Sequence, residues 1–134
     1  MPFFHRVFFC VAGRLPSDYS VDWRGDSALS DGSDVGVDLV GGMYDAGDHI
    51  KFSFPLAFTS TLLSWSVLEY SAQFSSVGLL DSTKGHIRWI TDYLLKTHNY
   101  IKNCQHGCIL DCNWSNILKR VVSVCSLLLL SRPI

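Results

Sequence analysis

Charge is scarce in this sequence of 134 residues. Charged side chains make up 17% of it, and eleven Lys and Arg nearly balance twelve Asp and Glu, so the formal net charge is −1. A chain with so little excess charge offers no basic surface for a polyanion, which excludes electrostatic binding of nucleic acid. The hydrophobic fraction of 48% is ordinary for a packed protein and excludes intrinsic disorder. The length allows one domain at most, which excludes a two-domain enzyme.

Long hydrophobic runs are missing as well. The longest, VVSVCSLLLL at residues 121–130, is about half of the ~20 residues that cross a bilayer. A second run, VFFCVA at residues 7–12, falls short of the ~7–15 residue core of a secretory signal. We therefore expect no membrane span, and the N-terminal run does not by itself indicate secretion.

Cysteine is present, but in no pattern that fixes its role. Cys10 stands alone and the other four come after position 103. The odd total of five argues against a secreted disulfide framework. Thiolate and imidazole groups near the C-terminus suit zinc, but their spacing matches no paired zinc template. We predict no cofactor and no metal site, including at the set Cys104, His106, Cys108 and Cys112.

Acidic residues are concentrated in one part of the chain. Eleven of the twelve are Asp, Glu69 is the one Glu, and eight of the Asp fall within residues 18–48. Arg24 is the one fixed cation of that segment, which leaves it with a net charge of −7. Residues 14–51 are rich in Gly, Asp and Ser and show neither a helix nor a strand period, which predicts a loop region. Loops of such length in compact domains are usually functional when they are ordered.

A long helix is predicted directly after this loop. It begins near Pro55, whose fixed φ suits a first helical turn, and runs to about Phe74. Leu62, Trp65 and Leu68 follow one another at helical spacing. From this spacing we expect Trp65 to pack in the core.

A second helix is predicted from Asp81 or Ser82, either of which can serve as N-cap, to about His98. Trp89 lies on an adjoining face, where we also expect core packing. The connection SSVGLL is short, which predicts an antiparallel pair of helices. Three apolar side chains mark the main face of the second helix: Ile87, Ile90 and Leu94.

The segment GGMYDAGD at residues 41–48 carries the most informative chemistry. Asp45 and Asp48 are three residues apart, and the neighbouring glycines allow sharp turns that can aim both carboxylates into one cleft. One Asp would then take the proton from a nucleophilic water while the second orients that water or shifts the pKa of the first. The spacing fits a tight turn or a cation-binding loop equally, although the EF-hand pattern is absent.

A second cluster, WRGDS at residues 23–27, precedes this segment. Arg24 and Asp26 are two residues apart, and we expect them to pin the loop by a charge-assisted hydrogen bond. Substrate contact is the alternative. Trp and Tyr rings stack on the apolar faces of sugars, so Trp23 and Tyr44 are candidates for a carbohydrate cleft.

The residues from Leu15 to Lys96 resemble the N-terminal part of glycoside hydrolase family 9, in its plant endo-β-1,4-glucanase (cellulase) branch. The segments VDWRGDSALSDG, VDLVGGMYDAGDHIKFSFPLAFTSTLLSWSVLEY and IRWITDYLLK carry the resemblance, with DAGD as its signature. It implies an all-α fold: an incomplete fragment of an (α/α)6 barrel with a long acidic loop and a non-matching C-terminal tail. We divide the chain accordingly into residues 1–98, the N-terminal part of the catalytic domain, and residues 99–134, a tail with no recognised resemblance.

The resemblance also implies an activity, the inverting hydrolysis of internal β-1,4-glucosidic bonds in cellulose or a related wall glucan. By position Asp48 would be the catalytic base and Asp45 would bind the same water. Tyr44 is the substrate contact that we expect from its aromatic ring. An extracellular or cell-wall location would follow.

The family's general acid is a Glu near the end of a much longer module, and Glu69 does not correspond to it. We therefore expect this chain of 134 residues to be inactive on cellulose. The alternatives are a non-catalytic glucan-binding remnant and an unstable truncated product.

Overall fold

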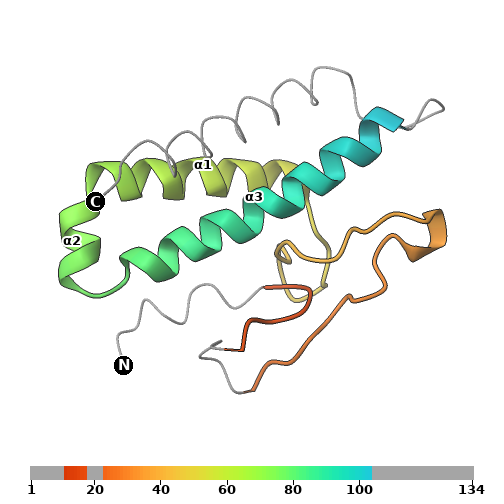
Figure 1. Ribbon diagram of the computed structural model, residues 1–134, viewed down its shortest axis with the longest axis horizontal. Coiled ribbons are helices and arrows are strands. Elements are labelled where there is room, and N and C mark those ends of the chain that lie inside the picture. Colours follow the sequence, from red (N-terminus) through yellow and green to blue (C-terminus); the bar gives the residue numbers. More distant parts are fainter. Residues whose placement is uncertain (1–10, 18–22, 104–134) are drawn as a thin grey trace.

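A computed structural model describes residues 11–17 and 23–103 (Figure 1). In this part of the chain there is no β-strand, and two isolated antiparallel bridges join Val11 to Met43 and Gly13 to Ser27. The described residues also contain no helix that is long and apolar enough to span a membrane. The all-α prediction is confirmed by four elements: the 3₁₀ helix η2 (Ser33–Val35) and the α-helices α1 (Ser53–Glu69), α2 (Ser71–Ser76) and α3 (Leu80–Asn103).

The two long helices, α1 and α3, lie side by side and are joined through the short α2, as Figure 1 shows. The predicted antiparallel pair is confirmed, but the first helix does not continue to Phe74. It ends at Glu69, and Tyr70 leaves the helical region with φ −117° and ψ 32°. The bend has a packing consequence, because Phe74 on α2 then lies against the buried cluster of Val67 and Ile87.

The face that α1 turns to the core has small side chains in its middle, between Leu56 and Val67. Ser60 is 0% exposed and Ser64 is 3% exposed, and the Ser64 hydroxyl donates to the Ser60 carbonyl at 2.8 Å, so its burial leaves no donor unsatisfied. Trp65 lies on the other side and is 64% exposed. The expectation that Trp65 packs in the core is therefore wrong. The spacing marked an apolar stripe correctly, but the stripe faces outward because another face of α1, which runs from Leu56 to Val67, is the buried one.

The face predicted for α3 is confirmed, since Ile87, Ile90 and Leu94 are all 0% exposed. Burial of an aliphatic side chain of this size contributes about 1.5–3 kcal/mol. The main cluster reaches beyond the helices, because residues from the N-terminal segment and from the acidic loop belong to it. The acidic loop is thus attached to the core through the cluster of Val11, Met43, Leu56, Ala57, Ile90, Tyr93 and Leu94.

Candidate active site

The predicted pair of carboxylates lies on one turn. The Asp45 amide donates to the Ile50 carbonyl at 2.8 Å, which closes the turn, and the His49 amide donates to the Ala46 carbonyl at 3.3 Å within it. The Ile50 amide donates to Asp48 Oδ1 at 3.3 Å. Both Asp side chains are exposed. The structure therefore places Asp45 and Asp48 together on a short closed turn that presents two carboxylates to solvent.

Tyr44 lies beneath this turn and is 7% exposed. Its hydroxyl donates to Ser27 Oγ at 2.9 Å, which links the turn to the WRGDS segment. The Arg24 guanidinium lies 5.5 Å from the centre of the Tyr44 ring, and the His49 ring meets it edge-on with 5.0 Å between centroids. The ring is thus mostly enclosed by the loop's own side chains.

Arg24 and Asp26 do hold the loop, but through other partners than predicted. Asp26 Oδ1 accepts from the Leu15 amide at 2.9 Å, whereas Arg24 contacts the Tyr44 ring. Among the described residues no ion pair joins Arg24 to Asp26. Their opposite charges and short separation in the sequence predicted a local ion pair, but each residue instead contacts a partner farther away in the chain. Trp23 beside them is 67% exposed.

The turn rests on α3 through Gly42. This residue has φ +76°, and a Cβ added to it would lie 2.7 Å from ring carbons of Tyr93. The Trp89 indole Nε1 donates to the Gly42 carbonyl at 3.0 Å, and Trp89 packs on the main cluster as expected. Glycine is needed here because the backbone must approach an aromatic ring closely in a left-handed conformation.

Two lysines outside the sequence motifs donate hydrogen bonds to backbone carbonyls of residues 39–41, just before the turn. Lys51 Nζ donates to the Leu39 carbonyl at 3.2 Å and to the Gly41 carbonyl at 3.1 Å, and it pairs with the Asp31 carboxylate. One signal was available, because Lys51 is the single fixed cation between Arg24 and Lys84 in the sequence. A lone cation next to a strongly acidic segment is a candidate for its counter-charge.

Lys96, on α3, is the second of these lysines. Its Nζ donates to the Val40 carbonyl at 2.9 Å and lies 2.8 Å from Asp38 Oδ2. The hydrogen bond from Lys96, followed by that from the Val40 amide, holds the pKa of Asp38 below its ordinary value of 3.8. Burial, followed by the charge of Asp31, raises the pKa of Tyr93.

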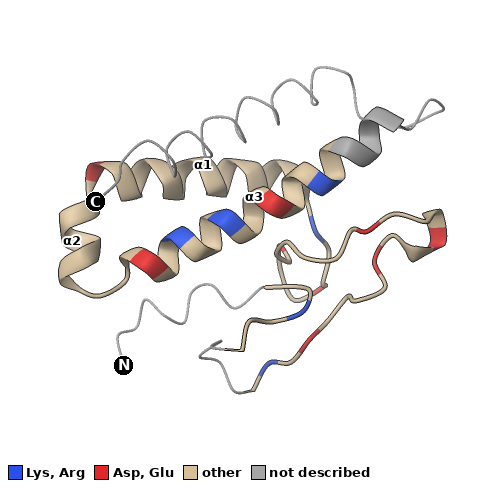
Figure 2. Ribbon diagram, in the orientation of Figure 1, with Lys and Arg blue, Asp and Glu red and all other residues tan. Residues whose placement is uncertain are grey.

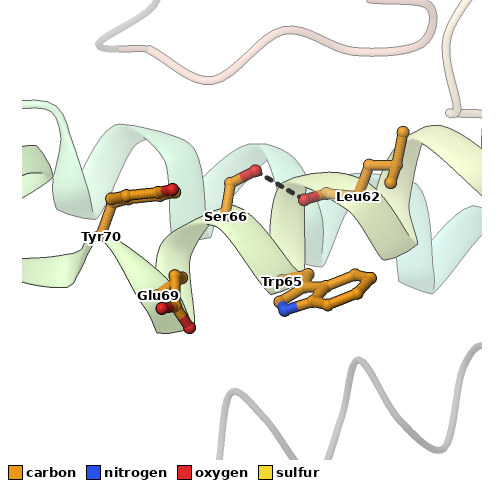
Figure 3. A pocket seen from close by; sticks show the side chains of 5 residues that line it. All are labelled: Leu62, Trp65, Ser66, Glu69 and Tyr70. Atoms are coloured by element: carbon orange, nitrogen blue, oxygen red, sulfur yellow. Dashed lines mark hydrogen bonds between the residues drawn. The ribbon is translucent and has the colours of Figure 1, made fainter.

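A depression on the surface of α1 lies apart from the acidic turn in the sequence, and no residue of the turn lines it. Ser66 Oγ donates to the Leu62 carbonyl at 2.8 Å along its wall (Figure 3). Glu69, the one Glu of the chain, belongs to this depression rather than to the loop. Its lining consists of Leu62, Trp65, Ser66, Glu69 and Tyr70.

Within residues 11–17 and 23–103 no group of three or more His, Cys, Asp or Glu side chains is placed to hold a metal ion. The thiol and imidazole groups that sequence analysis weighed for zinc lie outside the described residues. They are Cys104, His106, Cys108 and Cys112.

The fold and the loop together define a class of protein: an α-helical scaffold that carries a glycine-flanked pair of exposed aspartates. Residues 9–113 match the family model described as Glycosyl hydrolase family 9. The chain belongs to this family, which confirms the resemblance seen in the sequence. The match continues past position 98, where the sequence alone suggested a boundary.

Known endoglucanases are similar to this chain over about two thirds of its length. Endoglucanase 24 of Oryza sativa subsp. japonica is 59% identical over 93 residues, which cover 68% of this chain and 17% of the rice protein. Endoglucanase B of Cellulomonas fimi is 53% identical over 95 residues, which cover 69% of this chain and 9% of the bacterial protein. The chain thus spans less than a fifth of the length of these two relatives.

A solved structure of an endoglucanase from the termite Nasutitermes takasagoensis, at pH 2.5, has the same fold as this chain. The TM-score is 0.66 at 27% identity, and the match covers 93% of this chain and 40% of the termite chain. The expectation of a helical fold that forms part of an (α/α)6 barrel is confirmed.

Proposed function

We propose that the acidic turn supplies the water-activating half of an inverting endo-β-1,4-glucanase site, with Asp48 as the catalytic base. The observation that carries the proposal is the turn itself, which in a family 9 chain presents two exposed carboxylates and is closed by the Asp45–Ile50 hydrogen bond of 2.8 Å. A solvent-exposed carboxylate can accept the proton of a water molecule as that water attacks the anomeric carbon. Asp45, on the same turn, would accept the second hydrogen of this water and orient it.

Inversion also requires a general acid about 6.5–9.5 Å from the base, on the other side of the glycosidic oxygen. Glu69 lies at the end of α1 in a depression that the turn does not line. We infer that the described residues supply the catalytic base but no general acid, so the leaving alkoxide has no proton donor among them. A positioned acid contributes typically ~10²–10⁴-fold to the rate, and we expect negligible hydrolysis of cellulose by these residues alone.

The proposed substrate is a β-1,4-glucan, cellulose or a related wall polysaccharide, because the similar proteins are endoglucanases. The exposed ring of Trp23 offers a face on which a sugar can stack. Tyr44 is the second proposed contact, although it is 7% exposed and Arg24 and His49 lie against its ring. Such a polymer lies outside the cell, and we propose an extracellular or cell-wall location.

An activated glycoside tests the role of Asp48 without the missing acid. The leaving group of 2,4-dinitrophenyl β-cellobioside departs without protonation, so hydrolysis needs the base alone. We expect release of dinitrophenol above the buffer rate, with the α-anomer as first product. Asp48→Asn should lower this rate by about 10²–10⁴-fold, the usual contribution of a general base. Asp34→Asn, a change of another exposed Asp in η2, is the matched control and should have no effect.

Carboxymethyl-cellulose gives the complementary measurement. Ordinary endoglucanase turnover by the purified chain would show that an acid is present and would contradict the proposal. A rate on the activated glycoside that equals the buffer rate, or one that Asp48→Asn leaves unchanged, would contradict the role of the turn.

Binding of glucan without hydrolysis is a second candidate function. It is favoured by Trp23, which is 67% exposed and precedes Arg24, the residue that contacts the Tyr44 ring. Calorimetric titration with cellohexaose measures it directly, and Trp23→Ala should weaken the binding. A cooperative thermal transition in the same sample would separate both functions from an unstable product, which would give a sloping baseline instead.

A further inference from the structure

The chain that leads into the acidic turn has no regular secondary structure, yet four consecutive carbonyls of it accept hydrogen bonds from side chains. Residues 39–42 lie outside any helix or strand, so their backbone groups are not paired in a regular ladder. Two backbone hydrogen bonds reach them, from the Ala12 amide to the Gly42 carbonyl and from the Leu39 amide to the Asp31 carbonyl. Lys51 Nζ binds the carbonyls of residues 39 and 41, Lys96 Nζ binds that of residue 40, and Trp89 Nε1 binds that of residue 42. Two of these three donors are carried by α3.

Lys51 connects the two ends of the turn. It follows Asp48 by three residues in the sequence, while its ammonium binds the carbonyls of Leu39 and Gly41 in the stem that precedes the turn. Its side chain is 10% exposed, it pairs with Asp31, and its Nζ lies 4.9 Å from the centre of the Tyr93 ring. A largely buried ammonium is stable only when charged and polar partners surround it, and here those partners are the stem of the acidic turn.

Lys96 fixes the same stem from α3. Its ammonium holds the Val40 carbonyl and the Asp38 carboxylate at once, at 2.9 and 2.8 Å. The Val40 amide in turn donates to Asp38 Oδ1 at 2.9 Å, so the carboxylate is bound on both oxygens. Hydrogen bonds with a charged partner are about twice as strong as neutral ones. Lys96 therefore attaches the stem to α3 at residue 40, while Lys51 joins residues 39 and 41 to the chain that follows the turn.

We propose that Lys51 and Lys96 are positioning residues for the acidic turn, holding the stem at residues 39–42 so that Asp45 and Asp48 keep one orientation above α3. Neither ammonium carries out a chemical step. The consequence for catalysis rests on the function proposed above, whereas the consequence for the order of the turn does not.

Amide hydrogen exchange of the full chain tests the proposal. The Asp45 amide is bound to the Ile50 carbonyl, so it reports opening of the turn, while amides of residues 87–94 in α3 report global unfolding. In Lys51→Met and in Lys96→Met the Asp45 amide should exchange roughly tenfold faster or more, as expected from the loss of a charge-assisted hydrogen bond. The amides of α3 should change much less. Lys84→Met, in the same helix, is the matched control and should leave Asp45 unchanged.

A conservative variant separates positioning from general stability. Lys96→Arg keeps a cation within reach of Asp38 and should restore slow exchange at Asp45. The side chain of Lys96 is 37% exposed, so its truncation is compatible with folding even where that of Lys51 is not. The proposal would be overturned if amide exchange became faster by the same factor in the turn and in α3. It would also be overturned if the Asp45 amide exchanged in Lys51→Met and Lys96→Met at the rate seen in Lys84→Met. Failure of the wild-type chain to hydrolyse the activated glycoside would contradict the proposed function and leave the exchange result intact.

Discussion

The two long helices differ in the side chains that they bury completely, although they lie against each other. On α3 these include the large aliphatic residues Ile90 and Leu94, whereas on α1 small residues such as Ala57 and Ser60 are buried between Leu56 and Val67. Trp65 of α1 is exposed. Figure 2 shows the same contrast in charge, since α1 carries one charged residue at its end and α3 carries both signs along its length. Ile90 and Leu94 of α3 pack against Leu56 and Ala57 of α1 and against Met43 of the acidic loop in one cluster.

The two helices also differ in their packing partners among the described residues, because α3 has partners on two sides and α1 has a large apolar side that is exposed. Both sides of α3 have partners, because one packs on α1 and another binds the stem of the acidic turn through Trp89 and Lys96. The outer side of α1 exposes a stripe of large apolar groups of the kind that soluble proteins usually cover. This agrees with the match to 40% of the termite endoglucanase. The stripe consists of Phe54, Phe58, Leu62, Trp65 and Leu68, each between 41% and 64% exposed.

The largest effect is expected from a substitution that creates a cavity beside α3. Leu94→Ala removes a side chain that is 0% exposed and should lower the free energy of unfolding by about 2–5 kcal/mol. Leu62→Ala is the matched change on the outer side of α1, where the side chain is 46% exposed. It should cost less than about 1 kcal/mol, because little buried area is lost. Urea denaturation measures both. Equal costs for the two variants would show that the outer side of α1 is covered and would break the comparison.

A glycine at the loop–helix contact and a glycine on the exposed surface of α3 should respond to substitution with opposite sign. Gly42→Ala forces a Cβ to within 2.7 Å of the Tyr93 ring at φ +76°, so unfolding should become easier by about 1–3 kcal/mol. Gly85→Ala in α3 meets no atom within 4 Å and should stabilise the helix by up to about 1 kcal/mol. Thermal melts of both variants test this. Should Gly42→Ala melt like the wild type, the turn would not rest on α3 as described.

Local patterns in the sequence predicted local structure well. The spacing of Ile87, Ile90 and Leu94 gave the buried face of α3, and the acidic motif gave the two carboxylates that share a turn. Periodicity failed for Trp65 because it locates an apolar stripe without telling which side the core takes. The buried side of α1 combines small and hydroxyl-bearing residues with Leu56 and Val67, and the stripe that contains Trp65 is the outer one.

Contacts between distant residues could not be predicted from spacing. Lys96 binds the carbonyl of Val40, 56 residues away, and Trp89 binds that of Gly42, 47 residues away. Arg24 and Asp26 are near neighbours of opposite charge, yet each takes a partner elsewhere. Such contacts depend on how α3 and the loop pack, which no short stretch of sequence encodes.

The smallest effect expected is a pH dependence at the contact between the loop and α3. Lys96 and the Val40 amide lower the pKa of Asp38 below 3.8, so the charged form is favoured in the folded state. The stabilisation is therefore present above that value and is lost as the pH falls through the lowered pKa. The Asp38 side chain is 65% exposed, and water and salt screen the pair, so the effect is modest. Asp38→Asn keeps an acceptor for Val40 but removes the charge.

Denaturation midpoints measured from about pH 5 to about pH 2, on either side of the ordinary carboxyl pKa, test this prediction. The wild type should lose stability more steeply than Asp38→Asn over this interval, and high salt should reduce the difference. Asp34→Asn, another exposed Asp of the same acidic segment, should follow the wild type. Parallel curves for the wild type and Asp38→Asn would mean that the hydrogen bonds from Lys96 to the Val40 carbonyl and from Trp89 to the Gly42 carbonyl, rather than the charge on Asp38, attach this part of the loop to α3.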